Sequence, residues 1–483
     1  MAASQTIAKT VYAGAFVHSI SLTELEICEN GAIGVDEAGV IQFIERNGSE
    51  EWKEKEGWQS AKVVRLDGKG FFFPGFIDTH THAPQHPNTG LFGKTTLLDW
   101  LSTYTFPLEA SLSSLPKAHR IYTNFVSRTL SNGTTTCAYY ATRHVPATNL
   151  LSSICLARGQ RALVGRVCMD SLSPEYYRDA SIDSAVADSR ACVEYTRSID
   201  PTGAIVRPII TPRFAPSCTA PCLAALGALA RETHSYIQTH VSENTSEIQL
   251  VAQLFPESKS YTDVYDTANL LTEKTILAHA IHLSKQERDT IRARGAKISH
   301  CPASNTALTS GCCRVRQLLD EGLTVGLGTD VSGGFSPSIL EQVRQAIWTS
   351  RFVAMGDPSA GAADGKAKLS TAEALFLATR GGAQVVGLAD SVGGFEVGKE
   401  WDAQMVTLGE GVADGAGEGQ VDVDAFEVGG TSTALLESTN VDVFGWESSE
   451  ELVEKWVYSG DDRNCAAVWV RGRLVHKRND VVL

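Results

Sequence analysis

The chain has 483 residues, of which 43% are hydrophobic and 20% are charged, and this ordinary globular usage excludes a disordered, collagen-like or coiled-coil protein. The 42 basic and 56 acidic side chains give a formal net charge of −14. Such a charge disfavours sequence-independent binding to nucleic acid or to anionic membranes, so we expect small-molecule partners.

Residues 1–72 are predicted to form the first part of a small β domain. Short extended runs are separated by Gly, Asn and Asp turns, which is the pattern of strands and hairpins. These runs are residues 10–17, 32–35, 40–44 and 62–66.

Residues 73–392 are predicted to form a (β/α)₈ barrel of the TIM type, in the α/β class. Short apolar runs alternate with longer amphipathic stretches, as is typical of βα units around a parallel sheet. The runs are residues 76–82, 134–140, 162–169, 205–211, 236–241, 275–280, 296–300 and 324–329. Eight parallel strands is the number that closes such a barrel. Helices are expected at residues 117–130, 338–352 and 371–378.

Residues 393–483 return to a β pattern, with strand regions at 402–407 and 466–475 and a turn at Arg471-Gly472. We therefore expect both chain ends to build one small β-sandwich domain. Between these strand regions, residues 409–430 are rich in Gly, Asp and Glu and cannot bury much apolar surface. A mobile acidic loop is expected there.

The eleven cysteines are scattered along the chain, apart from the pair Cys312-Cys313. An odd count without a CxxC pair is not the pattern of a secreted disulfide scaffold, so we expect reduced thiols. The first residues lack a basic segment followed by an apolar one, and no run of ~18 apolar residues occurs in the chain. The expected location is the cytoplasm.

Two histidines alternate at the end of the first barrel strand. His80 and His82 are two residues apart, so in a strand both imidazoles point to the same face, as two ligands of one metal must. Two histidines at a strand end are often merely solvated. The hypothesis of a metal site therefore depends on further ligands.

Three other predicted strands also end in a possible ligand, namely His240, His279 and Asp330. In a barrel the carboxyl ends of the strands converge on the face where active sites assemble, so these residues predict one shared metal site. Imidazoles and one carboxylate without clustered thiolates suit borderline metals, and among these zinc is typical of hydrolytic chemistry. Zinc lowers the pKa of bound water to about 7.

Glu243 follows His240 by three residues, where its carboxylate could reach that water and move its proton. The alternative is a charge that favours a helix N-terminus. The fourth barrel strand has no lysine that could bridge two metals, which favours a single ion. The HExxH pattern of zincins is absent, and Cys222 is not followed by the second cysteine of the small zinc deaminases.

Segments spread over nearly the whole chain resemble the metal-dependent amidohydrolases. The elements shared across that superfamily are residues 74–82, 133–136, the strand ends at His240 and His279, residues 300–305 and residues 328–330. Within it, a second set is more similar to the guanine deaminase family, namely residues 98–107, 164–170, 211–217 and 330–335.

The resemblance implies hydrolytic deamination of guanine to xanthine and ammonia in purine catabolism, by a homodimer with one zinc ion per subunit. It implies a zinc site made of His80, His82, His240, His279 and Asp330. The catalytic residues would be Glu243, His279 and Asp330, with Glu243 protonating a ring nitrogen and then the leaving amine. Whether His279 binds the zinc or only polarises the water and the leaving group stays open.

The resemblance also implies a set of substrate contacts: His82, Ala83, Pro84, Gln85, Trp100, Arg213, Phe214, His240 and Asp330. Arg213 can donate to the ring edge that carries O6, Gln85 offers both a donor and an acceptor, and an aromatic ring can stack on the base. The alternative is a surface arginine with aromatic residues in the core.

Two other functions stay open. One is a different single-zinc ring deaminase, with an adenine-type, pterin or triazine substrate. The other is a non-catalytic barrel that serves as a scaffold, although such a protein would tend to lose ligands, and here the full set is present.

Overall fold

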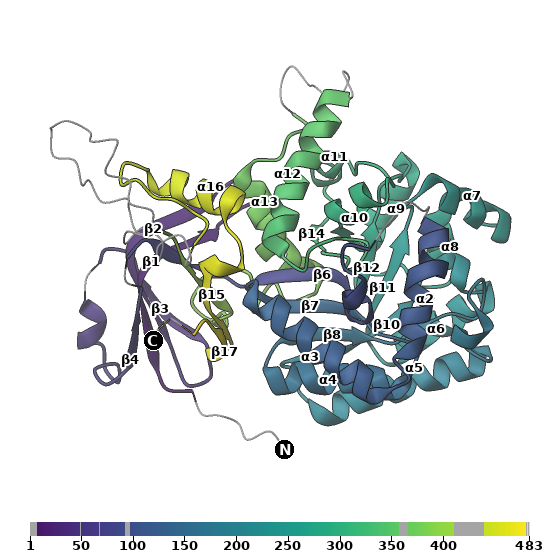
Figure 1. Ribbon diagram of the computed structural model, residues 1–483, viewed down its shortest axis with the longest axis horizontal. Coiled ribbons are helices and arrows are strands. Elements are labelled where there is room, and N and C mark those ends of the chain that lie inside the picture. The colour runs from purple at the N-terminus through teal and green to yellow at the C-terminus, as the bar shows by residue number, and fades with distance from the viewer. Residues whose placement is uncertain are drawn as a thin grey trace, which may run out of the picture.

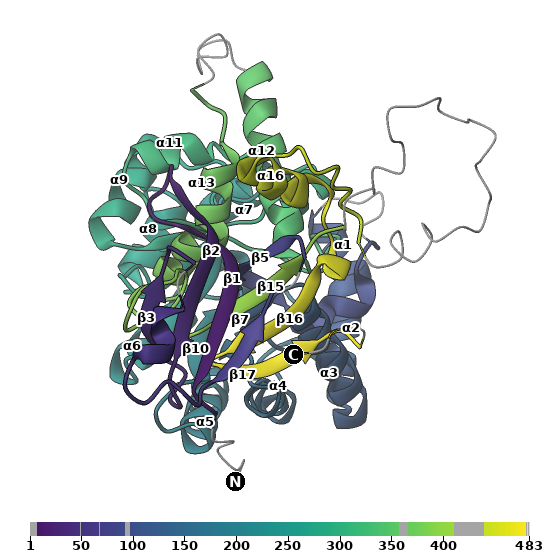
Figure 2. The same cartoon turned by 90° about the vertical axis from the view of Figure 1, so that its left-hand side faces the viewer.

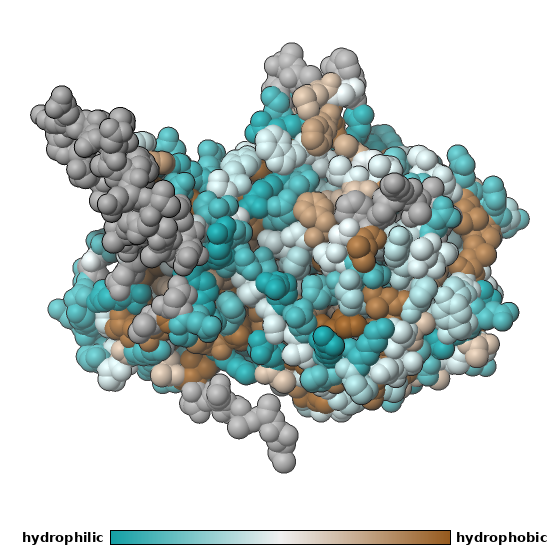
Figure 3. All heavy atoms as spheres, in the orientation of Figure 1, coloured by the Kyte–Doolittle hydropathy of each residue, from teal (hydrophilic) through white to brown (hydrophobic). Residues whose placement is uncertain are grey.

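The computed structural model describes residues 7–48, 50–66, 68–91, 97–356, 366–409, 439–479, 481 and 483. They form two sheets, one of them a ring of parallel strands surrounded by helices and the other built from the chain ends (Figure 1). Hydrophilic residues cover most of the face drawn in Figure 3. Within the described ranges, no helix is both long and apolar enough to cross a membrane.

Eight strands form the ring, in the order β14-β13-β12-β11-β10-β8-β7-β6, and each predicted barrel strand overlaps one of them. Their bounds are β6 (Phe76–His82), β7 (Thr134–Tyr140), β8 (Arg161–Gly165), β10 (Val206–Pro212), β11 (Tyr236–Val241), β12 (Thr275–His279), β13 (Lys297–His300) and β14 (Val325–Leu327). A short ninth strand, β9 (Val167–Cys168), continues beyond β8 and pairs with β10. All the ladders are parallel, which confirms the predicted barrel.

The ring closes between its first and last strands just beyond the end of β14. The backbone N–H of Asp330 donates to the carbonyl of His80 at 2.9 Å, and the N–H of His82 donates to the carbonyl of Val331 at 3.1 Å. Every residue of β6 and β7 is buried, because strands covered on both faces by protein expose no side. The closing bonds thus hold Asp330 beside the two histidines of β6.

Helices surround the ring and follow the strands in the chain. Their bounds are α3 (Leu115–Ser131), α4 (Val145–Arg158), α5 (Ile182–Ile199), α6 (Ala220–Glu232), α7 (Thr245–Leu254), α8 (Tyr261–Thr267), α9 (Lys285–Arg294), α10 (Pro302–Ala307), α11 (Val315–Asp320), α12 (Ile339–Gly356), α13 (Thr371–Phe376) and α14 (Gly382–Val385). In α3 the apolar residues Ile121, Phe125, Val126 and Leu130 are buried on one face, as their spacing predicts. Two short helices, α1 (Leu97–Trp100) and α2 (Phe106–Ser111), lie between β6 and α3.

The chain ends form one sheet, as predicted. Its strands are β1 (Thr10–Ser19), β2 (Leu25–Val35), β3 (Ile41–Glu45), β4 (Lys62–Arg65), β5 (Gly70–Pro74), β15 (Ala403–Thr407), β16 (Cys465–Val470) and β17 (Arg473–Lys477), with α16 (Ser449–Ser459) packed nearby. The order is β17-β16-β15-β5-β1-β2-β3, with β4 also pairing with β1. Figure 2 shows the strands of the two chain ends side by side.

This sheet folds over an aromatic core. The rings of Tyr12 in β1 and Trp469 in β16 lie 5.2 Å apart, although β5 and β15 separate their strands in the sheet. Trp401 stacks on Tyr12 at 4.3 Å in the same core. The expected sandwich is therefore one hydrogen-bonded sheet that faces itself.

Two expectations about the chain's organisation are not settled by these elements. The domain boundaries at 72/73 and 392/393 stay a prediction. The acidic segment at 409–430 lies, apart from Gly409, outside the described residues.

Candidate active site

The possible metal ligands meet at the carboxyl ends of the ring strands. His80, His240, His279 and Asp330 each offer one ligand atom, and these four atoms all lie within 4.8 Å of one another. The three histidines end or nearly end β6, β11 and β12, and Asp330 follows β14. Residues that are far apart in sequence thus converge at the place where the strand pattern predicts a site.

His82, the fifth predicted ligand, lies against this group. Its Nε2 is 3.3 Å from the Nε2 of His240 and 3.3 Å from an oxygen of Asp330. Two imidazole nitrogens that each bind one zinc ion at about 2.1 Å with a tetrahedral angle would be about 3.4 Å apart. The spacing of His82 and His240 therefore fits two ligands of one ion.

Neighbouring groups orient two of the imidazoles. The Nδ1–H of His240 donates to the carbonyl of Arg213 at 2.6 Å, and the Nδ1–H of His279 donates to the side-chain oxygen of Asn305 at 2.8 Å. Each bond leaves Nε2 as the nitrogen with a free lone pair, which is the arrangement of metal-binding histidines. The buried Nε2 of His279 has no hydrogen-bond partner among the residues described.

The protonation states also suit a cation. Burial lowers the pKa of His80, of His82 to about 4, and of His240 well below its ordinary value, so these imidazoles are neutral at pH 7. Burial alone would raise the pKa of Asp330, but hydrogen bonds to His80 and His82 hold that pKa well below its ordinary value. Metal ligands must be deprotonated in this way.

The backbone is strained at several of these strand ends. His279 has φ 71° and Asp330 has φ 45°, and Ser242, next to Glu243, has φ 48°. Residues other than glycine rarely adopt the left-handed region, and such conformations cluster at functional sites, where the surrounding structure maintains them.

Glu243 lies beside these possible metal ligands. One of its carboxylate oxygens lies 3.5 Å from Nε2 of His279, and the other accepts a hydrogen bond from Ser310 at 3.2 Å. Burial and then the charge of Asp330 raise the pKa of Glu243 to about 8. A carboxyl group with such a pKa can both hold and release a proton near neutral pH.

The alternative for Glu243, a charge at a helix N-terminus, falls instead to Glu247. Helix α7 starts after its N-cap Asn244, and the carboxylate of Glu247 accepts from the backbone N–H groups of Glu243 and Asn244 at 3.0 and 3.2 Å. Glu247 thereby completes the capping box, so the side chain of Glu243 is not needed for capping and faces the possible metal ligands.

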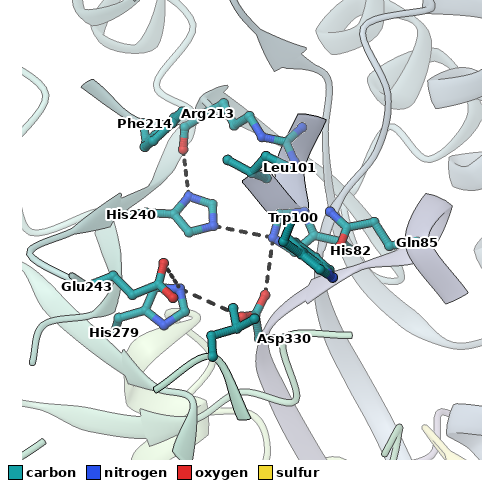
Figure 4. A pocket seen from close by; sticks show the side chains of 11 residues that line it. His82, Gln85, Trp100, Leu101, Arg213, Phe214, His240, Glu243, His279 and Asp330 are labelled. Atoms are coloured by element: carbon teal, nitrogen blue, oxygen red, sulfur yellow. Dashed lines mark hydrogen bonds and ion pairs between the residues drawn. The ribbon is translucent and has the colours of Figure 1, made fainter. Parts of the chain in front are cut away.

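A cavity lies directly against the possible metal ligands (Figure 4). It is lined by His82, Gln85, Trp100, Leu101, Arg213, Phe214, His240, Glu243, His279, Leu308 and Asp330. Seven of the nine predicted substrate contacts are in this lining. Ala83 and Pro84 are buried but do not line it. That these nine residues contact a substrate stays a prediction.

Arg213 is a buried residue, which excludes the surface alternative. Its exposed fraction is 2%, and its guanidinium forms a two-pronged ion pair with Glu109. Trp100 and Phe214 belong to one apolar cluster beside the cavity and also line it, so they serve both the core and the pocket.

The sequence profile of the amidohydrolase family matches residues 71–475. The chain belongs to the amidohydrolase family. This match spans the whole ring and, in the sheet from the chain ends, nearly all of β5, the whole of β15 and β16, and part of β17. It confirms the family resemblance that the metal-site motifs indicated.

Individual amidohydrolases are similar to this one over nearly its full length. Probable guanine deaminase of Schizosaccharomyces pombe is 47% identical over 96% of this chain and 83% of its own length. Human guanine deaminase is 37% identical over 96% of both chains. The crystal structure of guanine deaminase from C. acetobutylicum with bound guanine in the active site superposes with a TM-score of 0.83, at 30% identity, covering 97% of this chain and all of that one.

Several residues of this amidohydrolase site escaped the sequence analysis. Leu101 and Leu308 line the cavity, Tyr140 packs its ring 4.5 to 5.0 Å from three imidazoles, and Glu109 pairs with Arg213. The apolar residues carry no signal that separates them from the core. Glutamate is rarely buried, so the sequence gives no reason to place Glu109 inside.

Proposed function

We propose that this amidohydrolase is a zinc-dependent guanine deaminase that converts guanine and water to xanthine and ammonia. The observation that carries the proposal is one cavity in which a metal-ligand group, the carboxyl group of Glu243 and the buried Arg213 face the same space. The relatives that are 37–47% identical over 96% of the chain and are named guanine deaminases support the same substrate.

The residues that would hold the zinc ion are His80, His82, His240, His279 and Asp330. They fit because the imidazoles of His80, His82 and His240 are neutral, the carboxylate is ionised, and no thiolate that would favour a softer metal belongs to the group. A bound zinc ion supplies Lewis acidity, which makes water acidic enough to act as a nucleophile at neutral pH.

Glu243 moves the proton. Its carboxylate takes a proton from the attacking water and delivers it to ring nitrogen N3 while the new C2–O bond forms. Glu243 then takes the proton of the new C2 hydroxyl and delivers it to the amine on C2, so the C2–N bond breaks, ammonia leaves and a carbonyl group remains at C2. Asp330 and His279 flank this carboxylate at the metal group and orient the water toward C2.

Gln85 and Arg213 hold the opposite edge of the base, which carries O6, while Phe214 or Trp100 packs against a ring face. The side chains that line the cavity are buried, so these polar contacts act at short range in surroundings of low polarity.

The decisive experiment is to incubate the zinc-loaded protein with guanine and follow both ammonia release and the appearance of xanthine. Loss of guanine with stoichiometric formation of both products is expected. A parallel panel with adenine, a pterin and a triazine distinguishes the other ring deaminases. If zinc-replete protein turns over neither guanine nor any substrate of this panel, the protein is a scaffold.

The homodimer, the cytoplasmic location and the role in purine breakdown that the resemblance implies are part of this proposal. Light scattering coupled to size-exclusion chromatography tests the first of them.

A further inference from the structure

Glu109 is a fully buried carboxylate in α2, next to the cavity but outside its lining. A buried ionised carboxylate costs several kcal/mol unless it is paired and hydrogen-bonded. Burial alone would raise the pKa of Glu109, but the charge and the hydrogen bonds of Arg213 outweigh burial and keep that pKa below its ordinary value. Glu109 is therefore an anion, and its partners show what it does.

Four hydrogen bonds end on the carboxylate of Glu109. Arg213 donates to its two oxygens at 2.6 and 3.1 Å, the Nε2 of Gln85 donates at 2.9 Å, and the hydroxyl of Tyr177 donates at 2.9 Å. Each oxygen accepts two of these bonds. An ionised carboxylate offers about four acceptor sites, so Glu109 has none left for a ligand and acts through its partners.

The orientation of the Gln85 amide follows from the chemistry of its two neighbours. The carboxylate of Glu109 can only accept, and the backbone N–H of Ser332, 3.2 Å from Oε1 of Gln85, can only donate. The NH₂ group of Gln85 must therefore face Glu109, and its oxygen must face Ser332. One N–H of Gln85 remains for the cavity.

Arg213 is held in a similar way. Two of its five N–H groups bind Glu109, and the guanidinium lies 5.3 Å from the centre of the Phe106 ring. A guanidinium has donors and no acceptor. Gln85 and Arg213 both line the cavity, on the side away from Glu243 and His279 (Figure 4). The edge they form therefore presents hydrogen-bond donors.

We propose that Glu109 is a positioning residue that determines specificity: by locking Gln85 and Arg213 as donors, it selects purines with an oxygen at position 6 over purines with an amino group there. The inference rests on the proposed function and names the feature that decides its substrate class. An amino group at position 6 would place its own N–H groups against these donors, and two donors cannot form a hydrogen bond with each other. Sites built to hydrogen-bond one group strongly reject an analogue that cannot make the bond.

The test compares guanine with 2,6-diaminopurine, which carries the same amino group at position 2 and an amino group in place of O6. Loss of the 2-amino group gives xanthine from the first and isoguanine from the second, so chromatography of the products identifies the reaction. The wild-type protein is expected to prefer guanine by at least about 100-fold in kcat/KM.

The variant Glu109→Gln keeps the shape of the side chain but can donate as well as accept. The Gln85 amide can then turn, so the preference for guanine is expected to fall at least about tenfold, mainly through a higher KM for guanine. A matched control is Glu373→Gln. Glu373 is also buried and paired with an arginine, Arg316, but neither residue lines the cavity. This control should keep the wild-type preference.

If the Glu109→Gln variant does not fold, the Tyr177→Phe variant is measured in its place. It removes one of the four bonds to the carboxylate without touching the cavity, and the preference should fall about threefold. A folded Glu109→Gln variant, or in its absence a Tyr177→Phe variant, that slows both purines equally would overturn the inference, because a merely structural role predicts an unchanged ratio. If the wild-type protein forms no xanthine from guanine, the proposed function is wrong and the inference falls with it.

Discussion

The imidazole of His279 and the carboxylate of Glu243 face each other across 3.5 Å, measured from Nε2 to Oε2. Each is held from the other side, His279 by Asn305 and Glu243 by Ser310. The two atoms that meet are therefore directed into the cavity and toward Asp330, whose Oδ2 is 3.8 Å from the same nitrogen. This pair links the group that would hold the metal to the group that would move protons.

Replacing Glu243 with glutamine should lower kcat for ammonia release by about 10²- to 10⁴-fold, because an amide cannot take the proton from water. The zinc content, measured by mass spectrometry of the metal, should stay at the wild-type level. Glu287→Gln is the control, since Glu287 is buried but caps α9 away from the cavity. Near wild-type turnover by the zinc-containing Glu243→Gln protein would contradict the proposed role.

Removing the metal with a chelator should abolish ammonia release and lower the melting temperature. A ligand that binds only the folded state at about 1,000 times its Kd stabilises that state by about 4 kcal/mol. Adding back one equivalent of zinc should restore both properties. Full activity of protein shown to contain no metal would refute the metal-dependent mechanism.

Replacing Asn305 with leucine removes the acceptor that orients His279. Because such supporting bonds set the direction and basicity of a ligand, zinc affinity should fall about 10- to 100-fold. Competition with a fluorescent zinc chelator measures this directly. An unchanged affinity would mean that His279 does not bind the ion and only contacts water, which is the alternative left open by the sequence.

His300 should make the fold sensitive to acid. It is fully buried with both ring nitrogens unpaired among the residues the structure describes, and burial lowers its pKa to about 3. In the unfolded chain His300 has a pKa of about 6.5, so as the pH falls it binds a proton there before it does in the folded protein. The stability that the neutral buried imidazole contributes is therefore present above pH 6.5 and is lost as the pH falls toward 3.

Between pH 7 and pH 5 this loss amounts to about 2 kcal/mol. Urea unfolding of His300→Asn at both pH values should show a decline smaller by that amount than in the wild-type protein. Parallel declines in the two proteins would show that His300 does not contribute.

Replacing Asp402 with asparagine should destabilise the junction between the two sheets. Its carboxylate binds the buried Arg161 of β8 at 2.6 and 3.1 Å. Arg161 keeps its second partner Glu400, so the expected cost is that of lost hydrogen bonds to a charged group, about 1.5–3 kcal/mol. The midpoint of urea unfolding reports the change. Asp289→Asn, which breaks an exposed pair with Lys285, should leave the midpoint unchanged, and equal midpoints for both variants would contradict the expectation.

Much of the architecture was predictable because it depends on neighbours in the chain. The alternation of apolar runs and amphipathic stretches predicts the ring, and a two-residue period predicts that His80 and His82 share a face. The carboxyl ends of parallel strands meet on one face of a barrel, so the strand pattern alone predicts that His240, His279 and Asp330 lie together.

By itself, then, the sequence determined the class of fold, the residues gathered at the metal group and the family. Only the tertiary structure decided which hydrogen-bonding groups the cavity presents to a substrate. Glu109 and Arg213 are 104 residues apart, and Gln85 and Ser332 are 247 apart. No local pattern encodes such pairs, because burial and hydrogen-bond partners arise only when distant segments pack. The same packing assigns helix capping to Glu247 and leaves Glu243 in the cavity.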